Sequence, residues 1–177
     1  LRIATNPQLN GSAVITVNVD DGQETSSQSF LLRVTPLAGD TPLYRYYNRD
    51  IHDHFYTIVD RGERIGNYER EEGYRGGGIE CYVFSTQRPG TVPLYRFWNP
   101  SIGDHFYTTN ETERRALLNN PDWQSEGQAN PEEGIECYVF PTQRAGTVAL
   151  RRYRNDEIHD HFYTTNPAGE NLSGYVE

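Results

Sequence analysis

The chain has 177 residues, which is enough for one domain or for one domain and part of another. Its net charge of −9 argues against nucleic acid and anionic membrane surfaces as partners, because both need a basic face. No apolar run reaches the length that spans a bilayer, so we expect no membrane insertion. The 16 glycines, 10 prolines and 13 tyrosines are typical of turn-rich β structure with an aromatic core.

Residues 1–36 are predicted to be the end of a separate β domain. Apolar and polar residues alternate from residue 11 to residue 19, which predicts a half-buried strand, and Asp20-Asp21-Gly22 then predicts a turn. A second predicted strand ends at Pro36. This pattern resembles the terminal strands of bacterial immunoglobulin-like and cadherin-like domains. The resemblance implies the tail of an immunoglobulin-like sandwich. Residues 37–40, which follow it, are predicted to be a short linker.

Residues 41–177 repeat one unit three times, and such repeats decide the fold. The units span residues 41–90, 91–146 and 147–177. Each carries the string Asp-His-Phe-Tyr-Thr, and the first two close with Gly-Ile-Glu-Cys-Tyr-Val-Phe. The third unit stops at Gly-Tyr-Val-Glu, so we expect it to be incomplete, without its closing strand.

Three units of about four strands each predict an all-β fold with pseudo-threefold symmetry. Most propellers need at least four blades, so a β-trefoil-like repeat domain is the first expectation. A small three-unit barrel of another topology is the second.

The motifs of residues 41–177 resemble a family of secreted triple-repeat domains of unknown function. They are Leu-Tyr-Arg-Tyr-Tyr-Asn, Asp-His-Phe-Tyr-Thr-Thr and Gly-Ile-Glu-Cys-Tyr-Val-Phe. The resemblance implies an extracellular or cell-surface module that attaches a larger protein to a glycan or cell-wall polysaccharide.

No hydrolase, metalloprotease or nucleotide-binding motif occurs, so we expect neither an enzyme nor a cofactor. The alternative function is a structural, self-associating surface or filament protein. In that case the N-terminal strands would add to the sheet edge of another subunit.

The repeated Asp-His pair has three interpretations. We favour a structural role, in which the aspartate accepts backbone N–H bonds from the preceding turn and the histidine bonds a neighbouring strand or the asparagine of its own unit. A zinc site formed by His54, His105 and His161 is the least favoured interpretation, so no metal is expected.

The third interpretation is a glycan site. Sugar recognition needs an aromatic face for the ring and amide or carboxylate groups for the hydroxyls. The first two units place such groups side by side, whereas Arg154 replaces the aromatic residue in the third. The candidate ligand-binding residues are Tyr47, Asn48, Asp53, Trp98, Asn99, Asp104, Asn155 and Asp160.

Cys81 and Cys137 occupy the same position in two closing strands. In the first strand, alternation places Cys81 on one face with Ile79 and Val83, and Glu80 on the other. A disulfide between equivalent positions would need Cα atoms within ~7 Å of each other. We therefore expect two buried free thiols.

Overall fold

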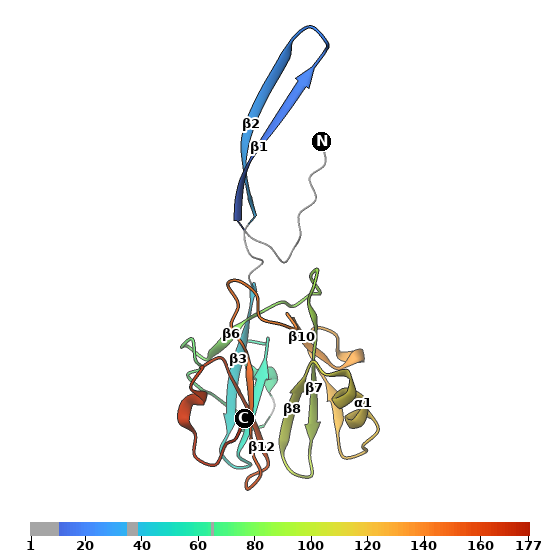
Figure 1. The fold of residues 1–177 in the computed structure, drawn as a ribbon. Helices are drawn as coiled ribbons and strands as arrows, with labels where there is room; N and C mark the ends of the chain where they lie inside the picture. Colours follow the sequence, from blue (N-terminus) through green and yellow to red (C-terminus); the bar gives the residue numbers. More distant parts are fainter. Residues whose placement is uncertain (1–10, 35–38, 65) are drawn as a thin grey trace.

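The computed structural model describes residues 11–34, 39–64 and 66–177 (Figure 1). As predicted, the fold is nearly all β, with a single α-helix among the described residues. The predicted strand end at Pro36 and the first half of the predicted linker lie outside these residues. In the part of the chain that the structure describes, no helix combines the length and apolar character that crossing a membrane requires.

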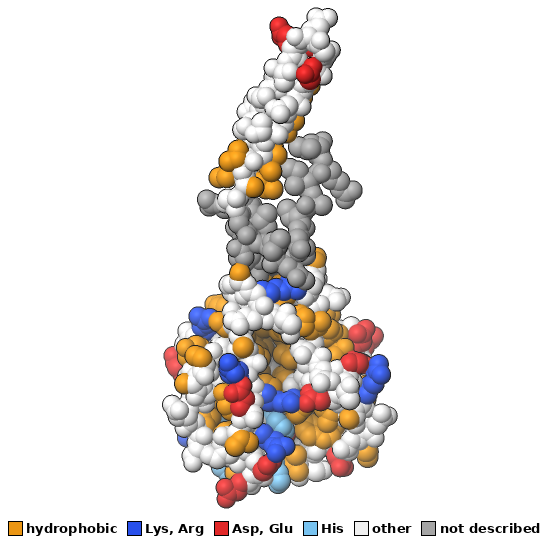
Figure 2. Space-filling view, in the orientation of Figure 1, with side chains coloured by type: hydrophobic (Ala, Val, Ile, Leu, Met, Phe, Trp, Pro, Cys, Tyr) orange, Lys and Arg blue, Asp and Glu red, His pale blue; other side chains and the backbone are white. Residues whose placement is uncertain are grey.

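The strands β1 (Gly11–Asp20) and β2 (Thr25–Val34) form an antiparallel hairpin that extends away from the remaining strands (Figure 1). The Asp20 and Asp21 carboxylates accept backbone N–H bonds in its turn, as the Asp-Asp-Gly sequence predicts. Acidic side chains gather at its tip (Figure 2). Among the described residues no third strand joins this hairpin. Its assignment to an immunoglobulin-like sandwich therefore stays a prediction.

The first unit is a four-stranded antiparallel sheet built around β3 (Thr41–Asn48). On one edge, β3 pairs with β4 (Asp53–Thr57). Its other edge pairs with β5 (Glu69–Arg70) and with β6 (Ile79–Val83), one after the other. The short 3-10 helix η1 (Gly62–Arg64) lies between β4 and β5.

The second unit has the same pairing around β7 (Val92–Asn99). Its partners are β8 (Asp104–Thr108), β9 (Gln124–Glu126) and β10 (Ile135–Val139). Helix α1 (Glu111–Leu118) follows β8, and the side chain of Asn110 caps it by accepting N–H bonds. The 3-10 helix η2 (Pro131–Glu133) precedes β10.

The third unit contains the hairpin of β11 (Arg151–Asn155) and β12 (Asp160–Thr164). An isolated bridge between Arg154 and Val176 takes the place of the β3–β5 pairing. The 3-10 helix η3 (Gly169–Asn171) lies between β12 and Val176 in the sequence. No further strand pairs with β11 or β12 within the described residues.

The three units meet through β4, β8 and β12, each of which contacts the other two (Figure 1). In the repeat domain, the named strands pair only with strands of their own unit. Between units, the described residues form one isolated bridge, from Phe84 to Tyr138. This pairing does not join the sheets into one closed barrel. The all-β class is thus confirmed, whereas the trefoil topology is not.

Three tyrosines form the centre of the core. The rings of Tyr56, Tyr107 and Tyr163 pack edge to face, with centroids 5.2–5.6 Å apart. Each hydroxyl donates to the backbone carbonyl of another of the three and accepts a backbone N–H bond. These bonds satisfy buried backbone groups that no ladder reaches. Cys81 and Cys137 pack against this centre as buried free thiols, which confirms the expectation.

Candidate functional site

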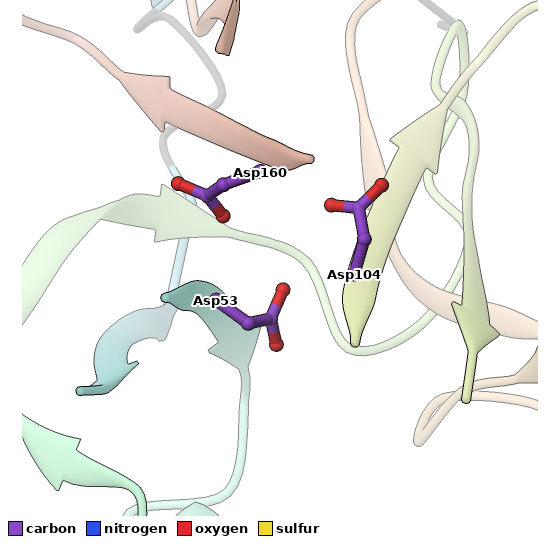
Figure 3. Close-up of side chains that lie close together, drawn as sticks. All are labelled: Asp53, Asp104 and Asp160. Atoms are coloured by element: carbon purple, nitrogen blue, oxygen red, sulfur yellow. The ribbon is translucent and has the colours of Figure 1, made fainter. Parts of the chain in front are cut away.

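The three aspartates of the repeated motif converge where the units meet (Figure 3). Asp53, Asp104 and Asp160 are the first residues of β4, β8 and β12, and all three are buried. One carboxylate oxygen from each lies within 4.8 Å of those of the other two. We call this group the aspartate cluster.

Each carboxylate of the cluster binds the histidine of another unit. One oxygen accepts the histidine backbone N–H at 2.8–3.0 Å, and the other accepts from Nδ1 at 2.5–2.7 Å. The pairs are Asp53 with His105, Asp104 with His161, and Asp160 with His54. The bonds therefore run from the first unit to the second, from the second to the third, and from the third back to the first.

This geometry confirms the structural role of the motif but corrects its partners. The aspartate does accept a backbone N–H, as predicted. However, the donor belongs to the next unit and not to the preceding turn, because the start of each central strand faces its neighbour. The three imidazoles each bind a different carboxylate, so they do not form the three-histidine zinc site.

A third hydrogen bond makes the three pairs unequal. The Tyr68 hydroxyl donates to Asp53 at 2.5 Å, and the Tyr175 hydroxyl donates to Asp160. In the second unit the same position is Trp123, which has no hydroxyl. Burial raises the pKa of the Asp104 carboxyl above its usual range, and the hydrogen bond from His161 only partly opposes this shift.

Two of the histidines lie between two carboxylates. The Nε2 atom of His54 is 3.5 Å from Glu71, and that of His105 is 3.6 Å from Glu126. Burial by itself would lower the pKa of His105, but the Asp53 and Glu126 carboxylates raise it above its ordinary value. A protonated His105 offsets the negative charge of the aspartate cluster.

A second set of bonds between units surrounds the first. In each unit an arginine forms paired hydrogen bonds with a glutamate of another unit, the geometry in which guanidinium and carboxylate bind best. These pairs are Arg45 with Glu170, Arg96 with Glu63, and Arg152 with Glu113.

Sequence alternation missed two glutamates of this set. Glu80 and Glu136 are fully buried, although each is adjacent in sequence to a buried cysteine. A register shift in both strands explains this, because a bulge adds one residue against the partner strand. Glu136 binds Arg96 at 2.7 Å and accepts the Ile58 N–H at 2.8 Å. The sequence signal was the Ile-Glu-Cys string, present in both closing strands.

The structure divides the candidate ligand-binding residues into two groups. The three aspartates are buried in the cluster, and the Oδ1 atoms of Asn48, Asn99 and Asn155 accept backbone N–H bonds within their own hairpin loops. These six side chains are engaged inside the protein and do not line a surface site with the aromatic residues, which corrects the grouping made from the sequence.

Tyr47 and Trp98 form the second group. Both are half-buried, and each ring packs on a histidine of its own unit. The ring centroids are 4.6 Å apart for Tyr47 and His54, and 4.4 Å apart for Trp98 and His105. In the third unit, Arg154 instead forms an exposed ion pair with Asp156.

Carboxylate oxygens are the ligands that hard cations such as Ca²⁺ and Mg²⁺ take, so the aspartate cluster is where a metal ion could find three oxygen ligands. Each carboxylate is already satisfied by its histidine, and these bonds account for the burial without an ion. Among the described residues, the hydrogen bonds of the aspartate cluster therefore connect the three units to one another.

A family model described as "Domain of unknown function (DUF5648)" matches residues 19–131 and 131–174. No curated protein and no solved structure matches the chain.

Proposed function

Since the chain belongs to the DUF5648 family, whose description names no function, we propose from its geometry that it is a non-catalytic extracellular module that binds carbohydrate or cell-wall polysaccharide. The observation that carries this proposal is the matching placement of Tyr47 and Trp98, both half-buried and each packed on a buried histidine.

Rigidity of the two aromatic rings favours this function. The histidines beneath them are fixed by the aspartate cluster through two hydrogen bonds each. A ring that is already held loses little side-chain freedom when a ligand packs against it. Its exposed part offers an apolar surface to the C–H groups of a sugar ring.

The loop that follows Tyr47 in the first unit carries exposed polar groups. Arg49, Asp50 and Asn67 are exposed, and Asn67 donates to Asp50 at 2.9 Å. The Tyr47 hydroxyl lies 3.1 Å from Nδ1 of His52. We propose that these groups bind sugar hydroxyls in place of the buried aspartates and asparagines.

Two equivalent aromatic sites on one domain would act together. Single sugar sites of this kind are weak, and two sites on one polymeric ligand raise the apparent affinity through multivalency. The proposal therefore favours a polysaccharide over a free monosaccharide.

A glycan array probed with the full chain tests the proposal. We expect binding that is strongly reduced in Trp98→Ala and further reduced when Tyr47→Ala is added. Tyr74→Ala, which removes an exposed tyrosine from a different loop, is the matched control and should bind like the unchanged chain. Silence across the whole array would refute carbohydrate binding. Full binding by the double variant would place the site elsewhere.

Self-association through the β1–β2 hairpin is the second candidate function. Val14 and Leu31 are 70% and 60% exposed on this hairpin, and its strand edges have no partner among the described residues. Gel filtration over a range of concentrations tests it. A larger species that appears with concentration and is lost in Leu31→Asp would favour assembly, whereas a monomer at all concentrations would count against it.

A further inference from the structure

The third unit has an open position where the other two units hold a strand. In the first unit residues 41–44 pair with β6, and in the second unit residues 92–95 pair with β10. The corresponding residues are 148–151, of which 148–150 belong to no strand and Arg151 begins β11. The side chains show the same difference, because Leu43 and Leu94 are buried whereas Leu150 is half-buried and Val148 is 48% exposed.

A cavity of about 670 Å³ lies along this open segment. Its lining joins Val148 and Leu150 of the third unit to Val139 and Phe140 at the end of β10, with Tyr163 of the core behind them. Hydrophobic side chains surround a hollow on the corresponding face in Figure 2. We call this cavity the third-unit groove.

Polar groups at the groove match those that bind a glutamate in the other two units. There, Glu80 bonds Arg45 and the N–H of Thr165, and Glu136 bonds Arg96 and the N–H of Ile58. Each of these glutamates sits opposite the first residue after a central strand.

In the groove the equivalent groups are Arg152 and the N–H of Thr109, and both line it. The Arg152 side chain is 38% exposed, against 7% and 3% for Arg45 and Arg96. The Thr109 N–H has no acceptor among the described residues.

We propose that the third-unit groove is a docking site for an extended peptide strand from outside residues 1–177, with the sequence pattern Gly-Ile-Glu-Cys-Tyr-Val-Phe that β6 and β10 share. The strand pairs antiparallel with residues 148–151. Its glutamate binds Arg152 and the Thr109 N–H. Its cysteine lies opposite Leu150, as Cys81 and Cys137 lie opposite Leu43 and Leu94.

The positions that β6 and β10 occupy in the first two units show why a strand with this pattern fits the groove better than another apolar segment. An apolar strand without an acid would leave the Thr109 N–H without an acceptor, and Arg152 with its Glu113 pair alone, at a site that the strand makes dry, which is costly. A glutamate directly before the cysteine can bind both the arginine and the backbone N–H, as Glu80 and Glu136 do in the first two units.

A labelled peptide tests the docking site. The probe is residues 134–140 carrying Cys137→Ser, with a dye attached through a glycine-serine spacer, and fluorescence anisotropy is measured against the full chain. We expect saturable binding. The same peptide carrying Glu136→Gln should bind at least about tenfold more weakly, because it cannot form the charged hydrogen bonds.

Two protein variants locate the binding. Val148→Asp changes an exposed residue of the groove, so the fold should survive while binding is lost. Arg152→Gln should weaken binding of the glutamate peptide and not that of the glutamine peptide. Arg115→Gln is the matched control, because this exposed arginine pairs with Glu111 on α1, away from the groove, and should leave peptide binding unchanged.

Three results would overturn the proposal. The first is that the glutamate peptide does not bind the full chain, even at concentrations well above those at which proteins ordinarily recognise peptides. The second is equal binding of the two peptides, or full binding to Val148→Asp. The third is a concentration-dependent dimer that Val148→Asp abolishes and the peptide does not, which would make a second copy of the chain the occupant.

Discussion

The carboxylate of Asp53 accepts two hydrogen bonds from His105, one from the backbone N–H at 2.8 Å and one from Nδ1 at 2.5 Å, across 52 positions of sequence. The same contact recurs from the second unit to the third and from the third to the first. Each aspartate therefore binds a histidine of another unit and not that of its own. This dependence of each unit on the next explains why the Asp-His pair recurs unchanged, and it makes the stability of the domain sensitive to each copy.

Removal of one carboxylate should destabilise the whole domain. Asp53→Ala leaves Nδ1 and the N–H of His105, together with the Tyr68 hydroxyl, without an acceptor in a buried site. We expect the free energy of unfolding to fall by about 3–5 kcal/mol, measured by chemical denaturation. Asp156→Ala, which breaks an exposed pair with Arg154, is the control and should cost at most about 1 kcal/mol. Equal losses in the two variants would contradict the role of the cluster.

The tyrosine centre should respond to the loss of a single oxygen atom. Tyr107→Phe keeps the ring but removes the donor to the Tyr56 carbonyl and the acceptor of the Tyr56 N–H. Leaving these two backbone groups unpaired should cost about 2–4 kcal/mol in the same denaturation experiment. Tyr74→Phe alters an exposed ring and should leave the free energy of unfolding unchanged. A small effect of Tyr107→Phe would mean that water replaces the hydroxyl.

The elements of the repeat domain could be predicted from the sequence because their signals are local. Strand alternation, turn residues and the repeated strings gave the hairpins of β3 with β4 and of β7 with β8. The contacts between units could not be predicted, since a single sequence does not tell which histidine an aspartate meets 52 or 106 positions away. The trefoil expectation rested on counting strands, which leaves the pairing between units undetermined.

The candidate site was predicted in part for the same reason. The identical Asp-His pairs indicated a structural role, but their residue types also suit sugar recognition, and only burial separates the two. A loop position shows a similar limit: His52 and His159 have a left-handed backbone, with φ near 60°, and Gly103 takes the same conformation in the second unit. Glycine adopts this conformation freely and histidine adopts it more often than most residues, so a backbone requirement is enough to explain the exchange of glycine for histidine here.

Glu136 should make the stability of the domain depend on pH. Burial raises the pKa of this carboxyl to about 7, with Arg96 and the Ile58 N–H opposing the shift. The folded protein then binds a proton at pH values where the unfolded chain, with an ordinary pKa near 4.5, has lost it. The contribution is therefore full below about pH 4.5 and is lost as the pH rises to about 7.

The comparison of two variants isolates this effect from other titrating groups. The free energy of unfolding of the unchanged chain should fall more steeply from pH 4.5 to 7 than that of Glu136→Gln, and the two curves should run parallel above pH 7. Glu132→Gln, at an exposed position of η2, should follow the unchanged chain throughout. A steeper fall in Glu136→Gln would reverse the sign and contradict the assignment.

The two thiols should be inert in the folded protein. Burial raises the pKa of Cys81 to about 12 and that of Cys137 well above its ordinary value, so almost no thiolate exists at neutral pH. We expect a thiol-reactive dye to modify neither cysteine within the time in which it labels a small free thiol, and to modify both after unfolding in guanidinium. Because Cys81 lines the third-unit groove and Cys137 does not, any slow labelling of the folded chain should reach Cys81 first. The peptide that fills the groove should suppress this labelling, and preferential modification of Cys137 would contradict the packing described for the core.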